Sequence, residues 1–406
     1  MQKAKQERRK TVSIIDKLNG KRILIWGYGR EGQSTERFLQ RCCKPASVEV
    51  FEGKRDGFNE DNYDWIVKSP GIVYHEANLK YLSQTEIFLE EFRDRVIGIT
   101  GTKGKSTTSS MLYTVLKECT NKKVIILGNI GQPCLDYFEE IDEDTIVVFE
   151  MSCHQLAHCE VSPHIALFMN FYEEHLDYYE TVERYFKAKS NITLYQREDD
   201  YFFVGDNVPE IETKAQVITM KRHGEQVFDL SVLGEHNIYN AQFVHYIATR
   251  LYGCDDAAVL ASMKAFQGLP HRLEHIGDVE GVAFYDDSIS TIPEATISAV
   301  KSIPNVQTVL IGGMDRGINY DVLIAFIKEN PQYRFVCMYD SGKRIHDAVG
   351  PCEQCIYVPD LELAVIEAKK VTDSGKSCVL SPAAASYGYF KNFEERGEFF
   401  KKYVLK

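Results

Sequence analysis

The chain has 406 residues, long enough for two or three domains, and 44% of its residues are apolar, so it can form sizeable cores. A formal net charge of −12 argues against nucleic acid or an anionic membrane as the main partner. The sequence has no apolar run of about 18 residues that would predict a membrane span. Its 11 cysteines follow no regular framework, which favours a reducing, cytoplasmic location.

The chain begins with a basic segment. Because no apolar stretch follows it, the segment is not expected to be a signal peptide. We expect residues 1–19 to form a flexible lead-in to the first of three predicted domains, which span residues 1–92, 93–268 and 269–406.

A glycine-rich turn after a strand opens the first domain. The segment Arg22–Trp26 is typical of a buried strand. It is followed by Gly27-Tyr28-Gly29-Arg30-Glu31-Gly32 and, about twenty residues later, by Glu52, as in dinucleotide sites. Such a turn binds NAD or another nucleotide diphosphate, or it simply packs a helix tightly on a sheet. Ser69-Pro70-Gly71-Ile72 ends the next strand and would face the same crevice.

The most informative segment runs from Gly98 to Thr108. An apolar run before it predicts a strand and the pattern after it predicts a helix, so the turn between them is placed to hold a nucleotide phosphate. Lys105 would supply a positive charge, and the Ser106 hydroxyl would bind Mg²⁺. The spacing departs from the usual one, because the glycine expected at Ile99 stands at Gly101. An ordinary glycine-rich turn with an exposed lysine is the alternative.

A second candidate for metal binding lies further along the central domain. The strand predicted at Thr145–Phe149 ends at Glu150. An acid at the end of a buried strand beside a phosphate loop is suited to hold Mg²⁺, directly or through water. The alternative is a strand-end carboxylate in solvent.

Lys189 lies on the apolar face of the helix predicted at about residues 181–194. The same stripe carries Val182, Tyr185, Phe186 and Ile192. A bare buried ammonium group is costly, so this lysine must extend to solvent, find a partner or be neutralised chemically. From the pattern alone, extension of the side chain to solvent is favoured.

The third domain alternates strand and helix patterns. Two of its strands lead into the loops Gly312–Arg316 and Ser381–Ser386, and ligands bind at such loops at the carboxyl ends of parallel strands. Together the patterns predict an α/β chain. Its first and third domains would be Rossmann-like, and its central domain would be of the P-loop type with a mainly parallel sheet.

Two groups of residues have side chains that can bind metals, but neither group is predicted to form a metal site. Cys352-x-x-Cys355 has no matching second pair, which makes a zinc or redox role weak. Cys153, His154, His158 and Cys159 crowd onto one short segment, where tetrahedral ligation is awkward.

Further segments complete a series of motifs along the chain: Gly128–Gly131, Glu150–Leu156, Asn170–Asp177, Tyr185–Lys189, Leu233–Asn240, Gly268–Glu274, Asp286–Ser288 and Leu380–Gly397. Together with the Gly98–Thr108 loop, and in this order, they resemble the motifs of the Mur ligases, which are ATP-dependent amide-forming enzymes of peptidoglycan precursor synthesis. The resemblance covers nearly the whole chain.

The resemblance implies how ATP and metal are bound. ATP would be held by Gly101, Thr102, Lys103, Gly104, Lys105, Ser106, Thr107, Asn129, Asn237, Asn240, His271, Arg272 and Asp287. Two Mg²⁺ ions are implied, with Ser106, Glu150, His175 and Lys189 as ligands. The lysine would carry CO₂ as a carbamate. The implied catalytic residues are Lys105, Glu150, His175 and Lys189.

The resemblance also implies sites for the other two substrates. The first-domain turn becomes a UDP-sugar site formed by Gly27, Gly29, Arg30, Glu31, Gly32, Glu52, Ser69 and Gly71. The incoming glutamate would contact Arg316, Ser386 and Phe393. Two residues depart from the family pattern. Ile289 occupies a position where the family commonly has a lysine, and Arg316 occupies the position of the family's glutamate-binding lysine.

The implied reaction is the ATP-dependent addition of D-glutamate to UDP-N-acetylmuramoyl-L-alanine through an acyl phosphate, with release of ADP and phosphate. The expected partners are these small molecules, and the chain is expected to act as a monomer. A ligase that adds L-glutamate and a folylpolyglutamate-type ligase are the related alternatives. Outside the family, the alternatives are an NAD-dependent oxidoreductase and a non-catalytic nucleotide-binding protein.

Overall fold

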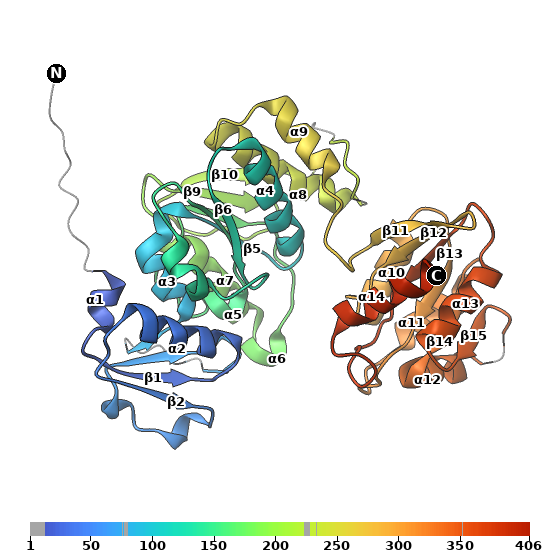
Figure 1. The fold of residues 1–406 in the computed structure, drawn as a ribbon, viewed down its shortest axis with the longest axis horizontal. Coiled ribbons are helices and arrows are strands. Elements are labelled where there is room, and N and C mark those ends of the chain that lie inside the picture. Colours follow the sequence, from blue (N-terminus) through green and yellow to red (C-terminus); the bar gives the residue numbers. More distant parts are fainter. Residues whose placement is uncertain (1–12, 75, 77–79, 223–227, 233, 351) are drawn as a thin grey trace. The chain divides into compact units, whose positions relative to one another are not determined.

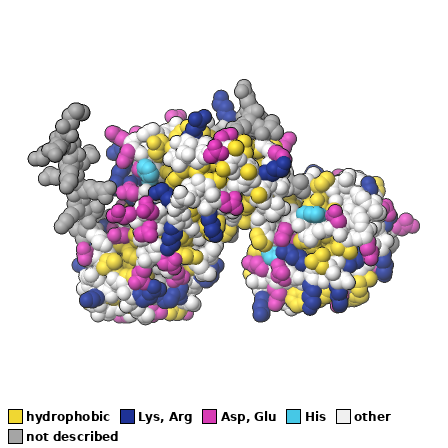
Figure 2. Space-filling model, turned by 45° about the horizontal axis from the view of Figure 1, so that its top comes forward, with side chains coloured by type: hydrophobic (Ala, Val, Ile, Leu, Met, Phe, Trp, Pro, Cys, Tyr) yellow, Lys and Arg dark blue, Asp and Glu magenta, His cyan; other side chains and the backbone are white. Residues whose placement is uncertain are grey.

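The computed structural model describes residues 13–74, 76, 80–222, 228–232, 234–350 and 352–406. The chain forms two compact units, one built from residues 1–229 and 236–264 and the other from 230–235 and 265–406. Figure 1 shows the ribbon. Within the described residues, no helix is long and apolar enough to cross a membrane. Acidic and basic side chains lie among one another on the face drawn in Figure 2.

The first unit begins with a small parallel sheet in the order β2-β1-β3-β4. Its strands are β1 (Arg22–Trp26), β2 (Ser47–Phe51), β3 (Trp65–Lys68) and β4 (Tyr81–Leu82), and its helices are α1 (Ile14–Leu18), α2 (Arg30–Cys42) and α3 (Gln84–Phe92). A Cβ at Gly32 would lie 2.2 Å from the Gly27 carbonyl oxygen, so only glycine lets α2 pack this closely on the turn after β1.

Part of the predicted flexible lead-in is ordered. Residues 14–18 form α1, and Ile14 and Leu18 are buried in the core of the first unit. The expectation of a flexible segment is therefore wrong for these residues, because burial of two aliphatic side chains holds the short helix in place. Residues 1–12 lie outside the described part of the chain.

A six-stranded parallel sheet forms the centre of the first unit, in the order β10-β9-β8-β5-β7-β6. Its strands are β5 (Val96–Thr100), β6 (Val124–Gly128), β7 (Ile146–Glu150), β8 (Ile165–Phe168), β9 (Tyr201–Gly205) and β10 (Gln216–Met220). Helices that accompany it are α4 (Lys105–Cys119), α5 (Cys153–Leu156), α6 (Leu176–Tyr179), α7 (Val182–Leu194), α8 (Glu235–Tyr246) and α9 (Asp256–Ala265). Because β7 and β8 lie on opposite sides of β5, the strand order reverses at β5, where such sheets bind ligands.

The small and central sheets share one apolar cluster. The Phe138 ring lies 4.6 Å from Phe38 of α2 and 4.8 Å from Phe92 of α3, measured between ring centroids. Aromatic pairs at this separation stabilise packing beyond their buried area. The domain boundary predicted after residue 92 falls at the end of α3, between the two sheets.

The second unit has a six-stranded sheet in the order β11-β12-β16-β13-β14-β15, in which only β11 is antiparallel to its neighbour. The strands are β11 (Glu274–Val279), β12 (Val282–Asp286), β13 (Val306–Ile311), β14 (Arg334–Met338), β15 (Cys355–Val358) and β16 (Ser377–Leu380). The helices are α10 (Pro293–Ser302), α11 (Asp321–Glu329), α12 (Tyr339–Val349), α13 (Leu361–Val371) and α14 (Phe393–Val404). The predicted α/β class with mainly parallel sheets is confirmed.

Candidate active site

The loop between β5 and α4 has the backbone of a phosphate cradle. Gly101 and Gly104 take φ values of 155° and 85°, and Gly104 caps the N-terminus of α4. The Asn170 side chain holds the loop, because its Oδ1 accepts from the Lys103 amide at 2.9 Å and its Nδ2 donates to the Lys103 carbonyl at 2.9 Å. The Lys105 amino group donates to the Gly101 carbonyl at 2.9 Å. Burial lowers the pKa of Lys105.

Helix α8 lies directly beside this loop. A Cβ at Gly104 would come within 2.7 Å of the Asn240 Oδ1 atom. The Asn240 amide donates to the Asn237 Oδ1 atom at 3.1 Å, and both side chains are buried. Predicted ATP residues of the first unit are thus gathered around one turn: Gly101, Thr102, Lys103, Gly104, Lys105, Ser106, Thr107, Asn237 and Asn240.

Glu150 is buried next to the loop and is not a solvent-exposed carboxylate. It pairs in register with Ile99 of β5, its side chain is 0% exposed, and its Oε1 accepts from the Asn129 amide at 2.7 Å. Its Oε2 atom is buried and has no hydrogen-bond partner among the described residues. A buried carboxylate oxygen without a partner is costly, so the site fits a cation that would compensate it.

Lys189 does not extend to solvent, so the favoured interpretation of its pattern is wrong. The side chain is 1% exposed because α7 packs against β5, β8 and α5. Its amino group donates to the Gly101 carbonyl at 2.8 Å and lies 5.1 Å from the centroid of the Tyr185 ring. Burial, assisted by the nearby positive charge of Lys105, lowers the pKa of Lys189 to about 7. A substantial fraction of this amine is therefore neutral near pH 7.

His175 starts α6 with a left-handed backbone, at φ 58°. Its ring centroid lies 5.1 Å from that of His154 and 5.7 Å from that of Tyr185, and its side chain is 42% exposed.

Among the described residues, the geometry of a metal-binding cluster is not met by Cys153, His154, His158 and Cys159.

A pocket of about 380 Å³ lies between the small and central sheets. On the side of the predicted UDP-sugar site, the pocket is lined by Arg30, Glu31 and Gly71. On the side of the predicted ATP site, it is lined by Gly128 and Asn129. The two predicted sites therefore face one space within the first unit.

The remaining predicted sugar residues support or flank the turn. Gly27 adopts φ 92°, and the Ser69 hydroxyl donates to the Gly27 carbonyl at 2.9 Å. Gly29 caps α2 and Gly32 packs the helix against the turn. Glu52 is exposed beyond β2 and is not among the residues that line the pocket.

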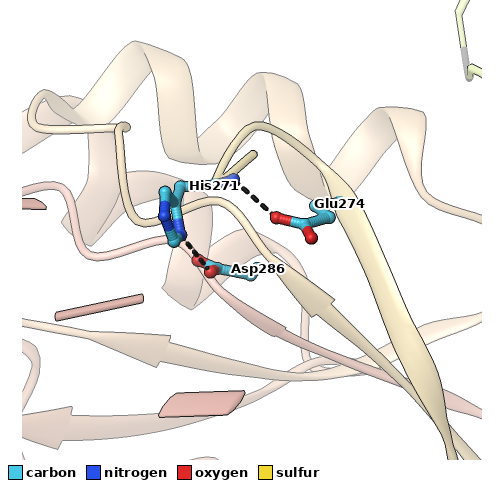
Figure 3. A group of neighbouring side chains, drawn as sticks. All are labelled: His271, Glu274 and Asp286. Carbon is cyan, nitrogen blue, oxygen red and sulfur yellow. Dashed lines mark hydrogen bonds and ion pairs between the residues drawn. The ribbon is translucent and has the colours of Figure 1, made fainter. Parts of the chain in front are cut away.

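In the second unit, His271 belongs to a compact polar group with Asp286 and Glu274 (Figure 3). Its Nδ1 lies 2.7 Å from Asp286 Oδ2, and its backbone amide donates to Glu274 at 2.7 Å. Burial alone would lower the pKa of His271, but the hydrogen bond to Asp286 and the charge of that carboxylate raise it. Glu274 also forms an ion pair with Lys401 at 2.9 Å. We therefore interpret the group as a structural network of hydrogen bonds and ion pairs and not as a metal centre.

Asp287 is 2% exposed and is hydrogen-bonded to other residues of the second unit. It accepts hydrogen bonds from the Ser381 hydroxyl at 2.7 Å and from the Leu273 amide at 3.3 Å, and burial raises its pKa to about 6. Arg272 beside it is exposed, as is the basic side chain Arg316 further along the chain.

Two of the predicted glutamate residues, Arg316 and Ser386, lie on loops at one end of the second sheet. The Met314 amide donates to the Ala385 carbonyl at 2.9 Å, which joins the loop of Arg316 to that of Ser386. Ser386 is 3% exposed. Phe393 begins α14, and its ring lies 6.2 Å from that of His271. Arg316 makes no hydrogen bond or ion pair with the described residues.

The sequence interpretation missed Arg396, a fully buried residue that joins the loops after β12 and β16. It donates to the Ser288 carbonyl at 2.7 Å and to the Ala384 carbonyl at 3.0 Å. Burial lowers its pKa to about 10. Its spacing of four residues from Phe400, on the buried face of α14, was the signal that could have identified it.

Comparison with known proteins relates the chain to one family. The model of the Mur ligase middle domain matches residues 99–223. Two relatives named UDP-N-acetylmuramoylalanine--D-glutamate ligase match over nearly their whole length. The protein from Aquifex aeolicus (strain VF5) is 32% identical, covering 94% of this chain and 98% of the relative. The protein from Ligilactobacillus salivarius (strain UCC118) is 30% identical, covering 97% and 98%.

The fold also has a match among solved structures. The MurF ligase from Thermotoga maritima in complex with ADP superposes with a TM-score of 0.61 at 16% identity, covering 94% of this chain and 95% of that one. At this identity the likeness concerns the fold alone.

Proposed function

The chain belongs to the Mur ligase family, and from this premise we propose that it adds D-glutamate to UDP-N-acetylmuramoyl-L-alanine at the expense of ATP. The names of relatives that match over nearly their full length support this substrate assignment. The observation that carries the proposal is the arrangement of the first unit. There, a phosphate loop, the buried Glu150 and Lys189, and a pocket lined by the first-sheet turn lie together.

The proposed reaction has two steps. The terminal carboxylate of the UDP-sugar substrate attacks the γ-phosphorus of ATP, which gives an acyl phosphate and releases ADP. The amine of glutamate then attacks the acyl carbon, phosphate leaves, and the nitrogen loses a proton as the amide forms. Because several anions must meet, the chain contributes mainly charge and placement, through Lys105 and the N-terminus of α4.

The residues present fit magnesium. We propose that Ser106, Glu150, His175 and a modified Lys189 hold two ions, which would neutralise phosphate charge when bound. The Glu150 Oε2 atom supports this assignment, because it is a buried carboxylate oxygen to which no residue in the described part of the chain donates a hydrogen bond.

We propose that Lys189 is the carbamylated residue. A neutral amine attacks CO₂ and loses a proton, and the product is a carbamate anion. The depressed pKa of about 7 favours the neutral amine, and the buried position beside the loop supports a carbamate whose oxygens would lie near the phosphates of bound ATP. The change would replace a buried cation with an anion suited to a metal.

Arg316 is proposed to hold a glutamate carboxylate, because its exposed guanidinium can grip a carboxylate with two parallel hydrogen bonds. A product assay tests the whole proposal. The chain is supplied with ATP, Mg²⁺ and UDP-N-acetylmuramoyl-L-alanine, together with D- or L-glutamate, and the product mass and released phosphate are measured. We expect one added glutamate per phosphate with the D isomer. No added mass with either isomer would refute the proposed reaction, and addition of L-glutamate alone would refute the stereochemistry.

A further inference from the structure

Each of the two pocket-lining turns of the first sheet is hydrogen-bonded to a short helix that closely follows a proposed metal ligand in the chain. In the first turn of α2, Glu31 Oε1 accepts from the Gln155 Nε2 atom at 2.7 Å. Gln155 belongs to α5, which follows Glu150 closely in the chain. This contact therefore links the glycine-rich turn to the end of β7.

The orientation of the Gln155 amide is fixed by its own helix. Its Oε1 accepts from the Ser152 backbone amide at 2.9 Å, and the Ser152 hydroxyl accepts from the Gln155 backbone amide at 3.2 Å. This reciprocal capping box leaves the Nε2 donor directed at Glu31. Ser152 is two residues from Glu150, so the Gln155 side chain connects Glu31 to the segment that follows β7.

The Glu31 carboxyl lies in a protected environment. The Lys68 side chain is 6% exposed, and its charge acts on Glu31. Burial raises the pKa of Glu31, whereas the hydrogen bond from Gln155 and the charge of Lys68 oppose that rise. Hydrogen bonds at low local dielectric are stronger than those in water, so this contact can hold a defined geometry.

A second hydrogen bond, independent of the first, connects the other pocket-lining turn, which contains Gly71, to α6. The Tyr178 hydroxyl donates to the Ile72 carbonyl at 2.8 Å, and the same carbonyl accepts from the Lys68 amino group at 2.9 Å. Tyr178 lies in α6, three residues after His175. The turn that contains Gly71 is therefore connected to the element that carries His175.

We propose that Glu31 and Tyr178 are positioning residues that fix the pocket-lining turns relative to the elements carrying Glu150 and His175. The inference rests on the proposed function, in which a substrate anchored on the first sheet must present its carboxylate to ATP held by the phosphate loop. Correct placement of two reactants contributes strongly to rate, and a displacement of about 1 Å can cost about 100-fold.

The same interface provides a matched control. Arg37, further along α2, forms a two-pronged ion pair with Asp136, with distances of 2.8 Å from Nη2 to each carboxylate oxygen. This pair joins the two sheets but does not line the pocket. A contact that merely holds the sheets together should therefore behave like Arg37, and a positioning contact should not.

The test compares Glu31→Ala, Glu31→Gln, Tyr178→Phe and Arg37→Ala in the product assay, together with their thermal stability. We expect Glu31→Ala and Tyr178→Phe to lower kcat about 10- to 100-fold with a much smaller change in KM for ATP. Glu31→Gln should recover much of the loss, because its amide oxygen can still accept from Gln155. Arg37→Ala should lower the melting temperature while kcat stays within about twofold of the unmodified chain.

Hydrogen exchange provides a readout that needs no turnover. Glu31→Ala should speed exchange of the Ser152 amide, which is bonded to the Gln155 side chain, and Arg37→Ala should not. The inference is overturned if the unmodified chain is active while Glu31→Ala and Tyr178→Phe keep its kcat. It is also overturned if activity falls only in proportion to stability in all variants, or if Ser152 exchange is unchanged in Glu31→Ala. An inactive unmodified chain would refute the proposed function instead.

Discussion

Replacing Lys189 with methionine should stabilise the protein and abolish its ligase activity. The amine is 1% exposed, and burial lowers its pKa from the usual 10.5 to about 7. A shift of this size corresponds to about 4 kcal/mol of lost stability at pH 7. Methionine fills a similar volume without charge, but it leaves the Gly101 carbonyl without this donor, at a cost of about 1 kcal/mol. The expected net gain is about 3 kcal/mol in the absence of CO₂.

The pH dependence of that gain identifies its cause. Because the folded-state pKa lies below the unfolded one, the unfolded chain binds the extra proton, and the stability of the unmodified protein rises with pH between about 7 and 10.5. The penalty from Lys189 is fully present below about pH 7 and fades as pH approaches 10.5. The advantage of Lys189→Met should therefore be largest at low pH and shrink through this window.

Urea unfolding in bicarbonate-free buffer measures the effect. Both tryptophans of the chain, Trp26 and Trp65, lie in the first unit with Lys189, so their fluorescence reports on the relevant part of the protein. Lys187→Met is the matched control, because Lys187 is exposed on the same helix and should change stability little. A Lys189→Met variant that is less stable than the unmodified chain near pH 7, or a difference that does not depend on pH, would refute the reasoning.

Three further substitutions test the site. Glu150→Gln should leave the chain folded but lower kcat by about 100-fold or more, with a weaker response in a Mg²⁺ titration; full activity would exclude a metal role. Gly104→Ala should raise KM for ATP about tenfold, because the residue sits at φ 85° and its new methyl would lie 2.7 Å from Asn240; an unchanged KM would contradict the close fit. Arg316→Ala should raise KM for glutamate about tenfold without changing that for ATP, as steady-state kinetics would reveal.

The buried strands could be predicted from the sequence, and the edge strands could not. The residues Ile23–Trp26 form a continuous apolar run after Arg22, and the structure places β1 over Arg22–Trp26. β2 and β10 lie at sheet edges, where most of their residues are exposed or half-exposed. Because these strands are not buried on both faces, their sequences mix polar and apolar residues and lack the continuous apolar run that identified β1.

The sequence identified the position of Lys189 on the apolar face of its helix but not its depth. A helix pattern defines which residues face the core, yet it does not reveal what lies above that face. Here the Gly98–Thr108 loop covers the helix, so extension of the side chain to solvent is blocked. The connections of Glu31 and Tyr178 were equally inaccessible, because they join residues more than 100 positions apart.

Lys105 and Lys189 lie close together at the phosphate loop. Their proximity explains why a carbamylated Lys189 fits this site better than a buried, unmodified lysine would. The Gly101 carbonyl oxygen accepts from both amino groups, at 2.9 Å from Lys105 and 2.8 Å from Lys189. When both amines are protonated, their charges repel each other at this one acceptor, and the single carboxylate of Glu150 cannot balance both. Carbamylation would change the sum over these three side chains from +1 to −1, taking Lys105 and unmodified Lys189 as positive and Glu150 as negative. It would release Lys105 from that competition to meet a phosphate, while the resulting negative charge suits a divalent cation.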